Sequence, residues 1–368
     1  MMLQRFADLY RHELLDRVIP FWMTHSLDRE HGGYFTGLDR DGSLYDSRKY
    51  VWLNGRQVWM LSKLYNEAGR KQEWLDAARL GAEFLRKHAF DEQGRCYFSL
   101  TREGEPAFMQ RKPYSAAFVA LGLHEYAKAT GDKSLEDEAI RLFSKVRQWI
   151  ANPELLGRPN TGASQLADIY VTAFLSLQVG QPMKECLDMI EPHWDPKIRS
   201  FRENALIGSD SPEVRLFCPG SVFEIGWFLL RLEPGPEKQQ MILTAMESAH
   251  HRGWDRDYGG YFYFMDVEDK PLLQLEWNMK LWWVHVEALA GFAHAYQATG
   301  DQKWLAYFEQ VHEYTWSHFR DPEYGEWFGY LDRRGERTHN LKGNNYKGCF
   351  HIPRALLLCS QIFSKLAN

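Results

Sequence analysis

The feature of the sequence that most constrains its fold is an internal repeat, in which an acidic loop is followed by glycine and then by aromatic residues. Four copies are clear: DREHGGYF from Asp28, DEQGRCYF from Asp91, DRDYGGYF from Asp255 and DPEYGEWF from Asp321. A degenerate copy, DPKIRSF, begins at Asp195, and the loop near Asn152 lies where another copy is expected. The copies begin 43 to 66 residues apart, so six units of about 60 residues account for the whole chain. A period of this size is typical of stacked or closed arrays of supersecondary units.

The segments of each unit predict two helices and a short hairpin. Each copy of the repeat leads into a turn, such as GLDRDG or GYLDRRG, which predicts a β-hairpin. The segments that begin at Trp74, Ala139 and Lys303 have apolar residues three and four positions apart, which is typical of amphipathic helices. The sequences ATGDKS and ATGDQK predict glycine turns between helices. We therefore expect an all-α fold, an (α/α)6 barrel formed by a single domain of residues 1–368 with short β-hairpins in its connecting loops. The alternative is an open helical solenoid of similar units.

Composition and charge exclude several classes of partner. Charged residues make up 25% of the chain and its net charge is −5, which gives no electrostatic reason to expect nucleic acid or an anionic membrane as a partner. No apolar run approaches the roughly 20 residues that span a bilayer, and charges interrupt the apolar residues of the N-terminal segment, so we expect a cytoplasmic protein. The five cysteines include no C-x-x-C pair, which favours buried free thiols over disulfides or a zinc site.

The chain is rich in aromatic residues, with 14 Trp, 18 Tyr and 22 Phe. Several of them adjoin charged residues, as Trp282 and Trp283 adjoin the segment with His285 and Glu287. Flat aromatic faces beside polar groups suit a sugar, because a sugar has apolar C–H faces and hydroxyl edges. Most of the rings are nevertheless expected in the core, between two layers of helices.

Arg56 is the first candidate for chemistry, because it stands among apolar residues in KYVWLNGRQVWMLSKLY. Arginine is seldom buried without a partner. A buried guanidinium that faces a cavity can hold a carbonyl oxygen or a developing oxyanion with several donors. The alternative is a structural ion pair with a carboxylate of the barrel.

Two further segments carry charged residues in otherwise apolar surroundings. In LEWNMKLWWVHVEALAG, His285 and Glu287 are two residues apart and cannot share one helix face, and His285 can equally be a satisfied core histidine. In KGNNYKGCFHIPRALLLC, Pro353 fits the first turn of a helix, so His351 is expected at or just before its N-terminus, with Arg354 in the first turn. The helix dipole and Arg354 both disfavour the imidazolium ion, which leaves His351 as a base near neutral pH.

The sequence contains no nucleotide-binding or metal-binding motif of the G-x-x-x-x-G-K-[ST], G-x-G-x-x-G or H-E-x-x-H type. The candidate residues can move protons and stabilise an oxyanion without a hydride carrier or a metal. We therefore expect no cofactor and no metal, and a small-molecule sugar as the ligand.

At these segments the chain resembles the N-acylglucosamine 2-epimerase family, over nearly its full length. The resemblance is carried by FWMTHSLDREHGGYFTGLDRDGSLYDSRKYVWLNGRQVWM, QLEWNMKLWWVHVEALAG, EYTWSHFRDPEYGEWFGYLDRRG and KGCFHIPRALLLC, and it weakens between about Asn152 and Phe217. It implies an (α/α)6 barrel, a homodimer, and chemistry on an open-chain sugar. In this chemistry the C2 proton is removed to give an enediolate. Reprotonation on the opposite face of C2 gives the 2-epimer, and reprotonation at C1 gives the ketose. A nucleotide effector is a property of some members, and no motif in this sequence indicates one.

The resemblance also assigns roles to residues. One of the two acid–base histidines of the family matches His351, and family arginines and glutamates match Arg56, Arg354, Glu287 and Glu224. For substrate binding we expect a further group of residues, namely Trp282, Trp283, His285, Tyr114 and Lys347.

Ser221 is the main departure from the family, because it stands where the P-G-H-x-x-E block has the second acid–base histidine. Serine is a poor base at neutral pH. Three explanations are open: another group, such as His285 or a water held by Ser221 and Glu224, makes the second proton transfer; His351 alone acts as a one-base aldose–ketose isomerase; or catalysis is impaired.

Two functions outside the epimerase class remain as rivals. Several glycoside hydrolases are helical barrels, and Glu224 and Glu287 are candidates for the two carboxylates that such enzymes require. A sugar-binding relative that does not turn its ligand over is the non-enzymatic alternative, and Ser221 is its main support. The sequence does not reveal which sugar is used.

Overall fold

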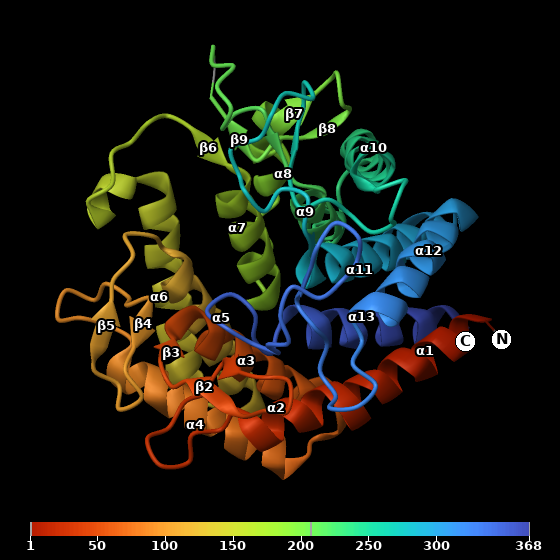
Figure 1. Ribbon diagram of the computed structural model, residues 1–368. Helices are drawn as coiled ribbons and strands as arrows, with labels where there is room; N and C mark the ends of the chain where they lie inside the picture. Colours follow the sequence, from red (N-terminus) through yellow and green to blue (C-terminus); the bar gives the residue numbers. More distant parts are fainter. Residues whose placement is uncertain (1, 207, 368) are drawn as a thin grey trace.

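The computed structural model describes residues 2–206 and 208–367, which form two concentric layers of helices (Figure 1). The inner layer consists of α3 (Val51–Leu64), α5 (Tyr114–Thr130), α7 (Leu166–Gln178), α9 (Pro219–Leu230), α11 (Trp282–Thr299) and α13 (His351–Ala367). The outer layer consists of α1 (Met2–His12), which continues through a π-helical segment (Glu13–Val18) into α2 (Ile19–His25), together with α4 (Gln72–His88), α6 (Lys133–Ala151), α10 (Pro236–Gly253) and α12 (Gln302–His318).

The fourth outer position along the chain, between α7 and α9, has no long helix among the described residues. It holds α8 (Cys186–Met189), which has four residues, and a 3-10 helix (Glu191–His193). This reduction explains why two copies of the repeat lie only 43 residues apart. The loop after Asn152 also departs from the expected hairpin, because it forms a 3-10 helix (Pro153–Leu156).

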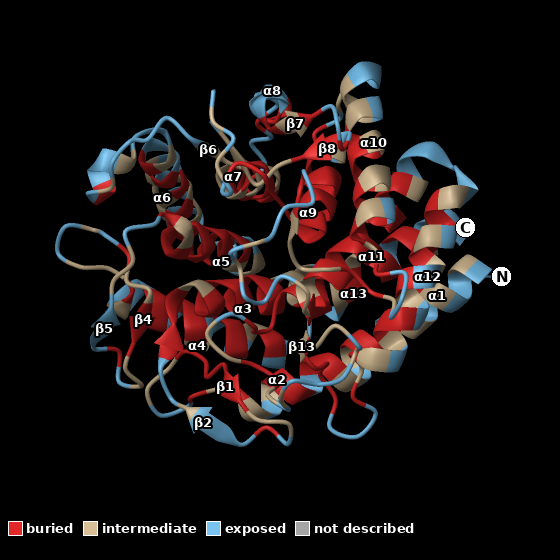
Figure 2. Cartoon of the chain, turned by 45° about the horizontal axis from the view of Figure 1, so that its top comes forward, coloured by how far each residue is buried: buried red, intermediate tan, exposed pale blue. Residues whose placement is uncertain are grey.

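Burial distinguishes the two layers, as Figure 2 shows. Every residue of α9 from Pro219 to Leu229 is buried, whereas α4 buries a single stripe toward the inner layer. A helix that is apolar all round belongs inside, and an amphipathic helix belongs at the surface. Glycines let two inner helices approach closely, because a Cβ atom on Gly122 would lie 2.5 Å from the Gly55 carbonyl oxygen.

The ring of inner helices is closed, which confirms the barrel and excludes the open solenoid. The last inner helix meets the first one where the Arg56 guanidinium lies 3.5 Å from the His351 ring. The rings of Trp59 and Phe350 are also in contact at this seam, with centroids 5.4 Å apart. α1 packs on α13, so the two ends of the chain lie close together (Figure 1).

The strands are short and antiparallel, and most of them join neighbouring units. β1 (Gly37–Leu38) with β2 (Leu44–Asp46), and β7 (Trp194–Asp195) with β8 (Ser200–Phe201), form hairpins inside one loop. Elsewhere a strand just before an inner helix pairs with the loop of the next unit: β3 (Lys49–Tyr50) with β4 (Ser99–Leu100), β6 (Ser164–Gln165) with β9 (Asn204–Ala205), β10 (Leu216–Phe217) with β11 (Met265–Asp266), and β12 (Lys280–Leu281) with β13 (Tyr330–Leu331). β4 also pairs with β5 (Pro106–Phe108).

The aspartate that opens a repeat is buried and holds two consecutive units together. Asp255 accepts a hydrogen bond from its own loop and pairs with Lys280, which lies on the strand before α11, at 3.0 Å. It also pairs at 3.0 Å with Arg333 from the next loop. Asp28 has the same partners in Lys49 and Arg102. The cations satisfy carboxylates that could not otherwise be buried.

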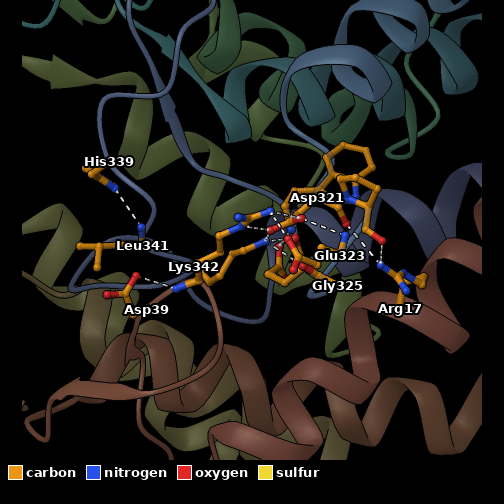
Figure 3. Close-up of polar contacts among 12 residues, drawn as sticks. Arg17, Asp39, Asp321, Glu323, Gly325, His339, Leu341 and Lys342 are labelled. Atoms are coloured by element: carbon orange, nitrogen blue, oxygen red, sulfur yellow. Dashed lines mark hydrogen bonds and ion pairs between the residues drawn. The ribbon is translucent and has the colours of Figure 1, made fainter.

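The third such cluster closes the barrel (Figure 3). Asp321, from the last copy of the repeat, pairs with Lys342 at 2.9 Å and with Arg40 at 2.8 Å. Lys342 also donates to the carbonyl oxygen of Gly325 at 2.8 Å. Because Arg40 belongs to the first hairpin, this ion pair joins the first unit to the last.

We predict that Asp255→Asn lowers the free energy of unfolding by about 3 kcal/mol, since it leaves the fully buried Lys280 without its anionic partner. Urea denaturation measures the change. The control is Asp257→Asn in the same loop, which removes an exposed carboxylate that also contacts Arg333 and should change stability by less than about 0.5 kcal/mol. Equal effects of the two substitutions would contradict the role of the buried pair.

Candidate active site

A cavity of about 490 Å³ opens among the N-terminal ends of the inner helices. Its walls are formed by Trp52, Arg56, Tyr170, Glu224, Tyr263, Glu276, Met279, Leu281, Trp282, Trp283, Tyr330, Tyr346 and His351. Five of the six inner helices contribute a residue from their first two turns. The partial positive charges of these helix ends favour negative charge in the cavity.

His351 is the first residue of α13, and its ring is fixed on both sides. Its Nδ1 lies 2.7 Å from Oε1 of Glu287, which is fully buried. A carboxylate at this distance favours the tautomer in which Nδ1 carries the proton. The lone pair of Nε2 is then left on the side of the ring that lies 3.5 Å from Nη1 of Arg56.

The pKa of His351 lies well below its usual value. Burial is the main cause, the charge of Glu224 opposes it, and Arg56 and Arg354 add to the lowering. The imidazole is therefore neutral at pH 7, which is the form that can accept a proton. This environment favours a base, as the position of His351 at a helix N-terminus and beside Arg354 led us to expect.

Arg354 connects the carboxylates below the cavity. Its Nη2 donates to Oε1 of Glu224 and to Oε1 of Glu287, both at 2.6 Å. Glu287 also accepts a hydrogen bond from the indole of Trp227 at 2.9 Å. The orientation of Glu287, and through it that of His351, is thus set by two donors, Arg354 and Trp227.

The arrangement of Glu224 and Glu287 does not suit glycoside hydrolysis. Both carboxylates bond to the same nitrogen of Arg354, and Glu287 is not among the residues that line the cavity. Two hydrolytic carboxylates need to stand on either side of a glycosidic bond.

The ligand atoms of Glu224, Glu287 and His351 lie within 4.8 Å of one another, a spacing that could hold a metal ion. The guanidinium of Arg354, however, already contacts Oε1 of both carboxylates. It supplies the positive charge that a metal ion would bring, so these three residues do not form a suitable metal site.

Arg56 has no ion-pair partner among the described residues. Its guanidinium lies between aromatic rings, 4.0 Å from Phe118, 4.3 Å from Trp52 and 4.6 Å from Phe350. Its Nε is buried without a hydrogen-bond partner, and burial lowers its pKa to about 9. The aromatic rings hold the planar guanidinium of Arg56 in place without using its N–H donors, which leaves these donors for a ligand.

The structure brings some of the expected substrate-binding residues to the cavity and places others elsewhere. Trp282 and Trp283 line it. His285 is fully buried outside the wall: its Nε2 accepts from the backbone of Tyr261, and its Nδ1 lies 2.7 Å from the carbonyl oxygen of Leu281.

Lys347 and Tyr114 also lie outside the cavity wall. Lys347 is buried and donates to Glu326 at 2.9 Å and to the carbonyl oxygen of Lys342 at 2.7 Å. The Tyr114 hydroxyl donates to Asp168 at 3.0 Å. Both residues fix segments that surround the cavity.

Ser221 is buried on α9, three residues before Glu224, and therefore on the same side of that helix. Sequence reasoning did not identify several wall residues, which are Tyr263, Met279, Leu281, Tyr330 and Tyr346. A signal exists for Tyr263, since it directly follows the repeat DRDYGGYF.

Comparison with solved structures identifies the class of fold. A cellobiose 2-epimerase from Bacillus thermoamylovorans matches with a TM-score of 0.83 and 21% identity, covering 98% of this chain and 99% of that one. A D-mannose isomerase matches with a TM-score of 0.83 and 18% identity, covering 97% of each chain. The fold is that of the (α/α)6-barrel sugar epimerases and isomerases.

Sequence comparison identifies the family. The profile of N-acylglucosamine 2-epimerase (GlcNAc 2-epimerase) matches residues 33–173 and 188–355. The N-acylglucosamine 2-epimerase of Mus musculus is 42% identical over 381 residues, which cover 96% of this chain and 90% of that protein. The chain belongs to the N-acylglucosamine 2-epimerase family, so the resemblance drawn from its sequence is confirmed, and it is an enzyme of the carbohydrate epimerase type. Within the residues that the structure describes, no helix is long and apolar enough to cross a membrane.

We predict that Arg56→Lys lowers kcat/KM by about 10²-fold, because a lysine keeps the charge but loses the planar fork of donors. Steady-state kinetics on the sugar substrate measures the loss. The control Arg79→Lys makes the same change on the exposed face of α4 and should leave the rate unchanged. An active Arg56→Lys variant would show that the fork is not needed.

Proposed function

We propose that this protein is a sugar 2-epimerase that interconverts N-acylglucosamine and N-acylmannosamine. Its membership of the family, with 42% identity to the mouse enzyme, supports this choice of substrate. The observation that carries the chemistry is the neutral, oriented imidazole of His351 beside the unpaired guanidinium of Arg56.

The first step is the removal of the proton on C2 of the open-chain sugar. His351 Nε2 accepts this proton, while Glu287 holds Nδ1 and stabilises the imidazolium ion that forms. The electrons of the C2–H bond move toward the C1 aldehyde and give an enolate, because C2 of this substrate carries the acylamino nitrogen and not a hydroxyl. Its oxygen accepts hydrogen bonds from Arg56, and the N-terminal ends of the inner helices favour its charge.

The second step returns a proton to C2 on the opposite face, which inverts that centre. Ser221 stands where the family has a second histidine. His285 does not fill this role, since both of its nitrogens lie within hydrogen-bond distance of backbone groups outside the cavity.

A one-base aldose–ketose isomerase is the second candidate function. Its support is the absence of a histidine at Ser221, together with the fold likeness to a D-mannose isomerase. In that reaction His351 alone would move the proton between C2 and C1 on one face of the enediolate.

The first experiment follows sugars in D₂O by proton NMR, with N-acetylglucosamine, N-acetylmannosamine, glucose, mannose and fructose as substrates. We expect loss of the C2 proton signal of the N-acetylated sugars and appearance of the 2-epimer. His351→Asn should lower the epimerisation rate by at least about 10²-fold, because it removes the base. A ketose without the 2-epimer would establish the isomerase instead, and exchange with none of these sugars would contradict both functions.

The pH dependence of kcat/KM tests the environment of His351. Burial lowers the pKa of His351, so the neutral base persists as the pH falls, and activity is lost only when the imidazole becomes protonated. We therefore predict that the acidic limb lies below pH 6.5 and disappears in His351→Asn. An acidic limb above pH 6.5 would contradict this assignment.

A cytoplasmic location, a homodimer and a nucleotide effector complete the proposal. The five cysteines are free and buried, which fits a reducing compartment. The homodimer and the effector rest on the resemblance to the family alone.

A further inference from the structure

Glu203 is an acidic residue in the short loop between β8 and β9. Its backbone is held at both ends: Leu166, the first residue of α7, donates to its carbonyl oxygen at 2.8 Å, and its own N–H donates to Leu216 at 2.9 Å. Glu203 is thereby fixed between the N-terminal ends of two inner helices, α7 and α9.

The Glu203 carboxyl is poorly satisfied. Its Oε1 is buried and accepts no hydrogen bond from any residue in the described part of the chain. A buried carboxyl oxygen without a donor is costly unless it serves a purpose. In an enzyme, such a group beside a cavity is a candidate for proton transfer.

The neighbours of this carboxyl belong to the active site. Tyr170, Tyr263 and Glu224, which line the cavity, all interact electrostatically with Glu203. The Ser221 hydroxyl is close enough to stabilise its ionised form. Glu203 therefore adjoins the residue that replaces the second histidine of the family.

The ionisation of Glu203 suits a proton donor. Burial raises its pKa to about 7, Ser221 opposes this change, and the charge of Glu224 adds to it. Tyr114 also faces the carboxyl, and burial raises the pKa of that phenol well above its usual value. Cys218 beside it has a thiol whose pKa burial raises as well. Glu203 is thus the neighbour that can exchange a proton near pH 7.

We propose that Glu203, acting through the hydroxyl of Ser221, makes the second proton transfer, on the face of C2 opposite His351. The inference rests on the proposed epimerase function and names the group that completes it. Ser221 lies on the side of α9 that carries Glu224 to the cavity, and its hydroxyl interacts with the Glu203 carboxyl.

The proton balance of the reaction is complete with these groups. In the resting enzyme His351 is neutral and Glu203 is protonated. His351 takes the C2 proton from one face, the Ser221 hydroxyl gives its proton to C2 on the other face of the enolate, and Glu203 replaces that proton. The products are the 2-epimer, imidazolium at His351 and carboxylate at Glu203. Proton exchange with solvent, or the reverse reaction, restores the resting state.

The variant Glu203→Gln separates hydrogen–deuterium exchange at C2 from inversion of C2. Glutamine keeps the shape of the side chain but cannot give up a proton. In D₂O, His351 should still replace the C2 hydrogen of one of the two epimers by deuterium, at a rate within about tenfold of the unaltered enzyme. Formation of the other epimer should fall by about 10²–10⁴-fold. Ser221→Ala should give the same separation. The control is Glu213→Gln, an exposed carboxylate in the next loop, between β9 and β10, which should leave both rates unchanged.

The pH profile gives a second readout. Because the protonated Glu203 is required, epimerisation by the unaltered enzyme should fall as the pH rises through about 7. The exchange that His351 performs in Glu203→Gln should lack this alkaline limb. The proposal is overturned if Glu203→Gln epimerises at the normal rate, or if it loses exchange with both epimers to the same extent as inversion. If the unaltered enzyme neither exchanges nor epimerises these sugars, the proposed function fails first and this proposal fails with it.

Discussion

The barrel depends on buried carboxylates, whose burial is possible only because each one forms ion pairs with cations. In two of the units the first aspartate of the repeat is paired with a lysine from the strand that precedes the next inner helix, and in the last unit Asp321 is paired with Lys342 from the loop before α13. The strand lysines fix where their helices begin, and in all three units an arginine from a further loop joins the same carboxylate. Since the cavity wall consists of these helix beginnings and loops, the same ion pairs that close the ring also place the active-site residues.

In the active site a buried cation is compensated by two carboxylates, whereas in the barrel a buried carboxylate is compensated by two cations. Arg354 is buried among aromatic rings and is compensated by Glu224 and Glu287. It holds Glu287 in a position where the carboxylate accepts a hydrogen bond from Nδ1–H of His351. A carboxylate with several fixed donors cannot reorient during the reaction, and such preorganisation stabilises charge that appears in the transition state.

The sequence predicts the architecture because the period of the repeat and the apolar spacing of the helices are local properties. It also predicts, through the family resemblance, that His351, Glu287 and Arg354 belong together. The surroundings of His285 were not predictable, because they depend on how the backbone of Tyr261 is placed by a distant loop. Glu203 was missed for the same reason, because the strand pairing next to it follows from the register of short strands, which no periodicity encodes.

Electrostatics favours proton delivery by Glu203 through Ser221 over delivery by a histidine at position 221. The cavity already contains the guanidinium of Arg56, and Arg354 lies beneath it. A second imidazole there would have to become a cation in each reaction cycle, next to two fixed positive charges. A carboxyl delivers the proton from its neutral form and becomes an anion, which the Ser221 hydroxyl stabilises. The charge of Glu224 raises the pKa of both His351 and Glu203, so it favours the protonated form of each of these groups. His351 becomes positive when Glu203 becomes negative, so the net charge of the site stays constant while C2 is inverted.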